Sequence, residues 1–293
     1  MAVKAQSESL PRVAVPADLR SRLRRRLETF PWWLVAMALL AVLVMSSILN
    51  NENYRDAFNF IRAGLTITLT TTISAFGIAL VIGLVTGLLR ISNSVVLRNA
   101  GTFYVEVIRG VPMMVLIFFI ALVVVPGAIQ ALNALGHQLY SLGLTSLGNR
   151  LTALDPSVVS MNLRAVVALS ITYGAFLAEI FRAGIQSIGR GQMEAARSQG
   201  MSYTQAMRYV ILPQAVRNVL PALGNDFVSM LKDSSLVSIL AVRDITQYAR
   251  LYAGRSFQFQ ETYTILAVLY LVMTVLLSFV VKYLERRYGQ HER

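Results

Sequence analysis

The chain has 293 residues, of which 55% are hydrophobic and 14% charged, and its mean hydropathy is +0.57. This balance excludes an ordinary soluble domain and indicates several membrane-spanning helices, while the absence of cysteine and the presence of two histidines leave almost no material for disulfides, thiol catalysis or zinc sites. The formal net charge of +12 favours contact with anionic lipid over contact with nucleic acid, because Lys and Arg gather on the cytoplasmic side of membrane proteins.

Five or six segments are apolar enough to cross a hydrocarbon layer about 30 Å thick, which requires about 20 helical residues. In chain order they cover residues 32–49, 63–89, 103–125, 165–188, a stretch within 219–241, and 263–281. The first follows a basic tail, residues 1–31, and lacks a small-residue cleavage site, so we expect it to remain as an anchor. The sequence therefore predicts an all-α membrane protein with about six transmembrane helices.

The distribution of cationic residues predicts the orientation of these spans. Six spans place both termini on one side, and the tail and the loops of that side hold most of the Lys and Arg residues. Both termini and the loop 190–213 are therefore expected in the cytoplasm, and the long loop 126–160 is expected outside. That outer loop is rich in leucine, and we expect part of it to form a short helix on the outer surface.

The polar loop 190–213 is predicted to form two short helices joined at Gly200. Residues 192–199 are good helix formers, and glycine suits the left-handed conformation that commonly ends a helix. Ser202 and Gln205 fit a capping box for a second helix that runs to the end of the loop. Ala195 and its neighbour leave one surface without bulk, which permits close approach of another protein, but the residues alone favour a solvated interfacial hairpin.

A pattern within this loop resembles the EAA loop of bacterial ABC importer permeases. The matching residues are Glu194, Ala195, Ala196, Gly200, Leu212 and Pro213. In that family the loop forms coupling helices that dock in a groove of the cytoplasmic ATPase subunit. The resemblance therefore assigns these residues to ATPase coupling and outweighs the interfacial hairpin.

Further stretches resemble the polar amino acid branch of the same permeases. They are YVEVIRGVP at 104–112, YGAFLAEIFR at 173–182, GQ at 191–192 and LKDSSL at 231–236. The resemblance covers roughly residues 64–287 and implies a type I importer core of five helices. The first helix and the long outer loop depart from that core, and neither departure touches the matching motifs.

Charged residues inside the predicted spans are candidates for the transport pathway or its gate. Glu106 with Arg109, and Glu179 with Arg182, are each spaced three residues apart, so each pair shares a helix face and can be partly neutralised. Gate or interhelix contacts and a purely intrahelical pair remain equal alternatives for these residues. Four further candidates for lining the pathway or bracing the helices are Tyr173, Asp226, Lys232 and Asp233.

The resemblance implies the membrane subunit of an ATP-driven amino acid importer in a bacterial inner membrane. No G-x-x-x-x-G-K-[ST] motif occurs in the sequence, so we expect no cofactor on this chain, with ATP and Mg bound by two copies of a separate ATPase subunit. The other expected partners are an extracytoplasmic solute-binding protein, the amino acid substrate, and a second permease chain, which is identical or a sibling. A secondary transporter driven by an ion gradient is the alternative, but the sequence has no convincing repeated half. A membrane hydrolase would need the G-x-S-x-G motif that this sequence lacks.

Overall fold

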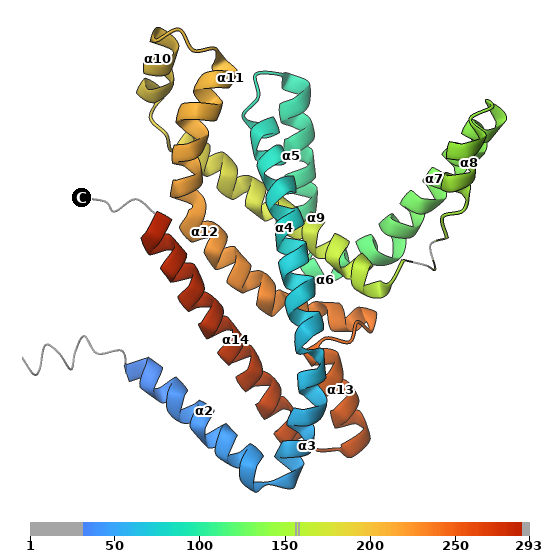
Figure 1. The fold of residues 1–293 in the computed structure, drawn as a ribbon, viewed down its shortest axis with the longest axis vertical. Coiled ribbons are helices and arrows are strands. Elements are labelled where there is room, and N and C mark those ends of the chain that lie inside the picture. The colour runs from blue at the N-terminus through green and yellow to red at the C-terminus, as the bar shows by residue number, and fades with distance from the viewer. Residues whose placement is uncertain (1–31, 156, 158, 289–293) are drawn as a thin grey trace, which may run out of the picture. The chain divides into compact units, whose positions relative to one another are not determined.

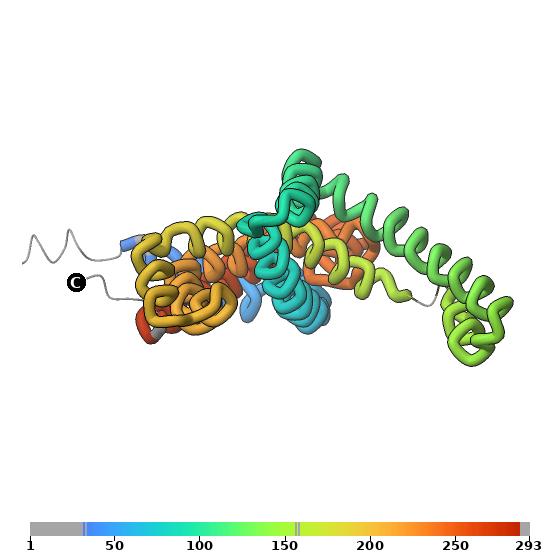
Figure 2. Tube along the Cα trace, turned by 90° about the horizontal axis from the view of Figure 1, so that it is seen from above, coloured from blue at the N-terminus to red at the C-terminus, as the bar shows by residue number. Residues whose placement is uncertain are grey.

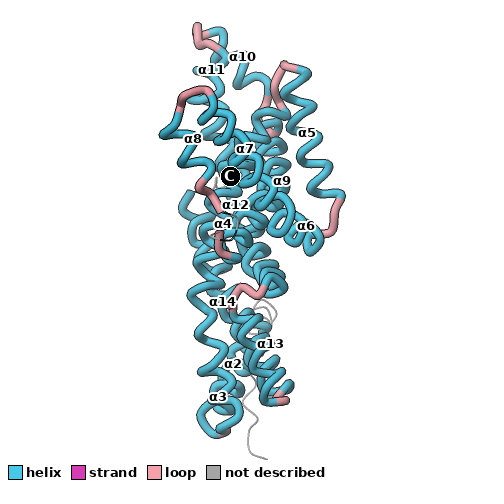
Figure 3. Tube along the Cα trace, turned by 90° about the vertical axis from the view of Figure 1, so that its right-hand side faces the viewer, coloured by secondary structure: helices cyan, strands magenta, loops and turns pink. Residues whose placement is uncertain are grey.

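The computed structural model describes residues 32–155, 157 and 159–288, and over this part of the chain it contains helices and loops but no strand (Figure 1, Figure 3). The expected all-α fold is confirmed. The basic tail, 1–31, lies outside the described residues. The chain divides into two compact units, Met1–Ser46 and Ser47–Arg293.

The described residues contain four helices that are long and apolar enough to cross a membrane, judged by length and composition. They are Glu52–Arg90, Met113–Ser141, Met161–Gln186 and Phe259–Arg287. The predicted first span forms the apolar helix α2 (Trp32–Asn50). The helix Glu52–Arg90 has three parts. It begins with α3 (Glu52–Ile61), continues through the turn η1 (Arg62–Gly64), and ends with α4 (Leu65–Arg90).

The predicted helix over 103–125 is wrong as a single element, because the chain breaks at Val111 and Pro112. Proline disfavours a helical conformation in the residue before it, and Val111 is extended, with φ −109° and ψ 137°. Helix α5 (Val95–Gly110) therefore ends there, and α6 (Met113–Phe119) starts a new direction. The span then continues through the π-helical turn η2 (Ile120–Val124) into α7 (Val125–Ser141).

The predicted outer loop is largely helical rather than irregular. Helix α7 continues the preceding span well into it, and α8 (Thr145–Thr152) turns back along α7 (Figure 2). Glycines permit this close packing: a Cβ atom at Gly136 would lie 2.8 Å from the Cβ of Leu151. The loop is thus a helical hairpin with one long and one short arm.

Helix α9 (Met161–Gln186) packs along α4 and lies at the centre of the main hydrophobic core. The contact is close, since a Cβ atom at Gly83 of α4 would lie 2.6 Å from the Cβ of Leu177, and one at Gly174 would lie 2.6 Å from Ile82. Small residues allow helices in membranes to approach in this way. The two helices are therefore fixed together along much of their length.

The predicted fifth span, 219–241, differs most from the structure. Residues up to Asp233 belong to α12 (Leu212–Asp233), and a 3-10 helix, η5 (Ser234–Leu240), follows. Helix α12 is not among the described helices that qualify as spans, because its charged residues lower its hydropathy. It packs instead against α9 and α14 (Phe259–Tyr288), which shield one side of it.

A second hydrophobic cluster joins α3, α13 (Ile245–Ser256) and α14. Asp244 caps the start of α13, where its Oδ1 accepts a hydrogen bond of 2.8 Å from the backbone N–H of Gln247. The side chain is buried, and this burial raises the pKa of Asp244 to about 6.

Candidate coupling and pathway site

The loop that matches the EAA pattern begins with α10 (Arg190–Ser198). As predicted, the chain leaves this helix in a turn at Gly200, two residues after its last residue. Gly200 has a φ of +85°, and its N–H donates to the carbonyl of Arg197 at 3.0 Å. The N–H of Met201 donates to the carbonyl of Ala196 at 3.2 Å, which completes a Schellman motif. Arg197 Nη1 also donates to the carbonyl of Met201 at 3.1 Å. Backbone and side chain thus fix the angle of the turn.

The predicted capping box after this turn is present. Ser202 Oγ accepts from the N–H of Gln205 at 3.2 Å, and Gln205 Oε1 accepts from the N–H of Ser202 at 2.8 Å. It starts α11 (Tyr203–Ala206). The two short helices and the glycine turn between them therefore form as the sequence indicates.

The second helix was expected to run to Pro213, but it continues through Pro213 into α12. Proline has no N–H, and within a regular helix it would leave a carbonyl without a donor. Here the turn η4 (Met207–Ile211) is π-helical, and the N–H of Leu212 donates to the carbonyl of Met207. The chain from Tyr203 to Asp233 is consequently one uninterrupted helix formed by α11, η4 and α12.

The six coupling candidates have different exposure. Glu194, Ala195, Gly200 and Pro213 are exposed, Leu212 is half-buried, and Ala196 is buried. Beneath the loop, Ile185, Ile211 and Ala215 form a small hydrophobic cluster with neighbouring apolar side chains. Ala196 thus packs within this chain, while the surface available to another protein is formed by the exposed candidates.

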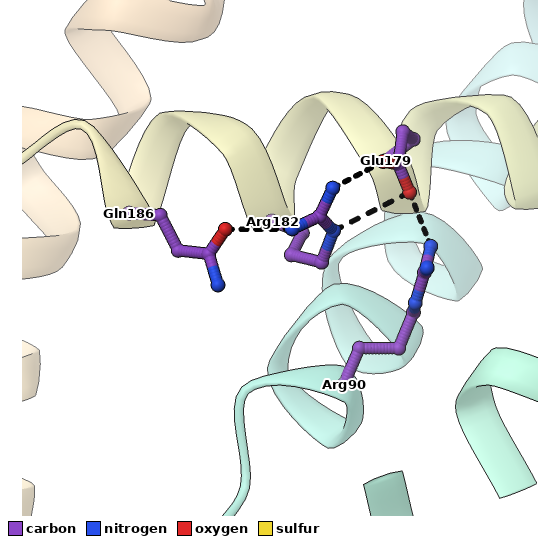
Figure 4. A network of polar contacts seen from close by, with 4 residues as sticks. All are labelled: Arg90, Glu179, Arg182 and Gln186. Carbon is purple, nitrogen blue, oxygen red and sulfur yellow. Dashed lines mark hydrogen bonds and ion pairs between the residues drawn. The ribbon is translucent and has the colours of Figure 1, made fainter. Parts of the chain in front are cut away.

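A charged network joins α4 and α9 immediately before the coupling loop (Figure 4). Glu179 makes ion pairs with Arg182 on its own helix, as the spacing predicted, and with Arg90 at the end of α4. Arg182 Nη1 also donates to Gln186 Oε1 at 2.6 Å. Glu179 is therefore an interhelix contact as well as part of an intrahelical pair.

The network touches the elements that carry the loop. Gln186 is the last residue of α9, and Asn218 of α12 donates to the hydroxyl of the following Ser187 at 3.2 Å. A cavity of about 390 Å³ separates Arg90 and Gln186 from Met193 of α10 and from the helix after the glycine turn. The end of α9 is thus bonded to α12 and lines the same cavity as the helices of the loop.

The second charged pair, Glu106 and Arg109, has the same spacing as Glu179 and Arg182 but does not form the same ion pair. Glu106 and Arg109 are both exposed and form no ion pair within the part of the chain that the structure describes. The guanidinium of Arg109 lies 5.9 Å from the centre of the Phe176 ring. At this point α5 contacts α9 through a cation–π interaction rather than an ion pair.

The remaining pathway candidates separate into two sets. The buried Tyr173 of α9 donates a hydrogen bond of 2.7 Å to Asp233 Oδ2 at the end of α12. Asp226 is half-buried and Lys232 is exposed, and neither makes a hydrogen bond or ion pair within the described residues. Tyr173 and Asp233 thus brace α9 against α12. Asp226 lies near enough to both to interact with them electrostatically, and Lys232 directly precedes Asp233 but is exposed.

Residues 79–290 match the family described as the binding-protein-dependent transport system inner membrane component. The probable glutamine ABC transporter permease protein GlnM of Bacillus subtilis is 36% identical over 232 residues, which cover 79% of this chain and 94% of that protein. The glutamine transport system permease protein GlnP of Escherichia coli K12 is 34% identical and matches over 75% of this chain and 89% of its own.

Solved structures agree with these relatives. An amino acid ABC transporter crystallised with histidines has a chain that is 36% identical, with a TM-score of 0.62, over 78% of this chain and 94% of that chain. A chain of the MetNI methionine ABC transporter shares the fold, with a TM-score of 0.60 at 18% identity, over 79% of this chain and 97% of that one.

Proposed function

Because the chain belongs to the family of binding-protein-dependent transport system inner membrane components, we propose that it is the permease subunit of an ATP-driven amino acid importer. The family is a transport component of the inner membrane, not a catalytic one. The relatives that match over three quarters of this chain are amino acid or glutamine permeases by name, which supports an amino acid as the substrate. The same relatives disfavour the alternative of a secondary transporter.

The structure of the loop 190–213 is the main support for the proposed coupling to an ATPase. Glu194 and Ala195 lie on the exposed side of α10. The hydrogen-bonded glycine turn follows, and one continuous helix leads from this turn to Asp233. A partner that binds the exposed side can move this helix, which contains Pro221 between the turn and Asp233. The bond from Tyr173 to Asp233 would carry that movement to α9.

The proposed partners follow from this mechanism. Two ATPase subunits would bind ATP and Mg and dock on the loop, and this chain would bind no cofactor. A second permease chain, identical or a sibling, would complete the path, and an extracytoplasmic binding protein would deliver the amino acid. Glu106, Arg109 and Lys232 are exposed on the single chain, which supports a place for them at the path or at the second chain.

Co-purification tests the proposed ATPase coupling. A tagged full-length chain should retain an ATPase subunit from its own membrane, and Glu194→Lys should reduce that retention because the change reverses a charge on the exposed face. Glu52→Lys is the matched control, since it makes the same charge reversal at an exposed position of α3, outside the loop. Retention by Glu194→Lys equal to that of wild type would remove the loop from the interface.

Orientation has a separate test. The sequence has no cysteine, so Gln199→Cys and Ser146→Cys each introduce one reactive site. A membrane-impermeant maleimide added to intact cells with a permeable outer membrane should label position 146 and leave position 199 unlabelled. Labelling of position 199 would invert the proposed topology, in which both termini are cytoplasmic.

A further inference from the structure

A groove lies between the first turns of α12 and the last turns of α14, and it has a volume of about 880 Å³. The two helices are in tight contact at Gly224, where a Cβ atom would lie 2.1 Å from Val281 Cγ1. Leu220 and Leu284, each about one helical turn beyond this contact, line the groove. The groove thus opens toward the coupling loop from a closed, apolar inner end.

Three cationic residues line the groove. Arg208, Arg217 and Arg287 line it, and no acidic residue is among its lining residues in the described part of the chain. Arg208 and Arg217 are exposed and are in no ion pair between described residues, while Arg287 donates to the hydroxyl of Tyr283 at 3.3 Å. Guanidinium groups along one groove suit the binding of a phosphate group.

The rest of the groove's lining is apolar. Its lining includes Leu212, Pro213, Val216, Leu220 and Leu284, and both Val216 and Leu284 remain exposed, by 40% and 42%. A groove of this kind offers one surface for a charged group and an adjoining surface for hydrocarbon. A free phosphate or nucleotide would leave the apolar part uncovered.

The residues around the groove are those typical of the lipid headgroup region. The apolar span of α14 ends at Arg287. Two exposed tyrosines contact the arginines of the groove, Tyr209 beside Arg208 and Tyr283 beside Arg287. Tyrosines and arginines are enriched at the membrane–water boundary. Basic pockets between helices at the cytoplasmic boundary are suited to anionic headgroups.

We propose that this groove binds an anionic phospholipid, with the phosphate held by arginines among Arg208, Arg217 and Arg287 and an acyl chain along the apolar residues of the groove. The inference rests on the proposed cytoplasmic position of the coupling loop, which places the groove in the inner leaflet. Arg208 and Leu212 belong to the continuous helix that follows the glycine turn. The lipid would therefore bind the same helix that carries movement from the ATPase.

Native mass spectrometry of the detergent-solubilised, full-length chain tests the site. Dioleoyl phosphatidylglycerol should bind more tightly than dioleoyl phosphatidylcholine. The double variant Arg208→Gln with Arg217→Gln should weaken phosphatidylglycerol binding by about 10- to 30-fold, because each cation near the surface contributes to attraction of anionic lipid. The matched control is Arg98→Gln with Arg286→Gln, which removes the same charge from exposed positions outside the groove and should bind as wild type does.

A second variant separates loss of the site from misfolding. Val216→Trp fills the apolar part without altering charge, and it should weaken phosphatidylglycerol binding while the chain still retains its ATPase partner. Equal binding of the two lipids by wild type, or equal loss in the double variant and its matched control, would overturn the proposal. Either result leaves ATPase retention unchanged, so failure of the lipid site and failure of the proposed function are distinguishable.

Discussion

Replacing Gly200 by valine should weaken docking of the ATPase partner without preventing insertion of the chain. Gly200 has a φ of +85°, and a Cβ atom there would meet nothing within 4 Å, so the cost of a side chain is conformational rather than steric. A β-branched residue in the left-handed region costs about 1–2 kcal/mol. If docking requires this turn, the affinity for the ATPase should fall by about 5- to 30-fold, since 1.4 kcal/mol corresponds to a factor of ten.

The assay is titration of the purified ATPase against the chain in nanodiscs, together with coupled transport in proteoliposomes. Gly200→Asn should retain most of the affinity, because asparagine tolerates the left-handed conformation better than other residues with side chains. Gly254→Val is the matched control, since it lies outside the loop, has open space around it and no positive φ. Docking by Gly200→Val with the affinity of wild type would refute the role of the turn.

Three further changes test contacts within the chain. Arg90→Gln should destabilise the contact of α4 with α9 by about 1 kcal/mol and uncouple ATP hydrolysis from transport, whereas Arg98→Gln, which removes an exposed charge outside the network, should not; equal transport by both would contradict the role of the network. Tyr173→Phe should lower the free energy of unfolding by about 0.5–1.5 kcal/mol in denaturant melts, because it removes the donor to Asp233, and an unchanged midpoint would argue against that brace. Asp244 has a pKa raised to about 6, so the stability from its protonated form is present below about pH 4 and is lost as the pH rises through 6. Asp244→Asn, which can still cap α13, should therefore stabilise the chain by up to about 3 kcal/mol at pH 8 and very little at pH 4, and an equal effect at both would contradict the burial of the charge.

Local signals predicted the coupling loop well. The left-handed turn at Gly200 and the capping box of Ser202 and Gln205 depend on residues within one helical turn of each other, so a sequence contains all their determinants. The same is true of the pair Glu179 and Arg182. The break at Val111 was also readable from the proline after it, but hydrophobicity across 103–125 concealed it.

Contacts between distant segments could not be predicted in this way. Arg90 directly follows the predicted span 63–89, and nothing near it in the sequence indicates Glu179 as its partner. The sequence favours the end of a helix at Pro213, because proline has no N–H to donate within a helix. The helix nevertheless continues, because the π-helical turn before Pro213 accommodates the proline. The pairing of Tyr173 with Asp233 likewise depends on how α9 and α12 pack.

Uptake by reconstituted vesicles tests the central claim most directly. The full-length chain, with its ATPase, second permease chain and binding protein, is placed in proteoliposomes and supplied with a panel of radiolabelled amino acids, with ATP or a non-hydrolysable analogue on the side of the coupling loop. The account predicts accumulation of at least one amino acid that requires hydrolysable ATP and the binding protein, and that is reduced in Gly200→Val but not in Gly254→Val. Uptake driven by an ion gradient without ATP, or ATP-driven uptake indifferent to Gly200→Val, would contradict it.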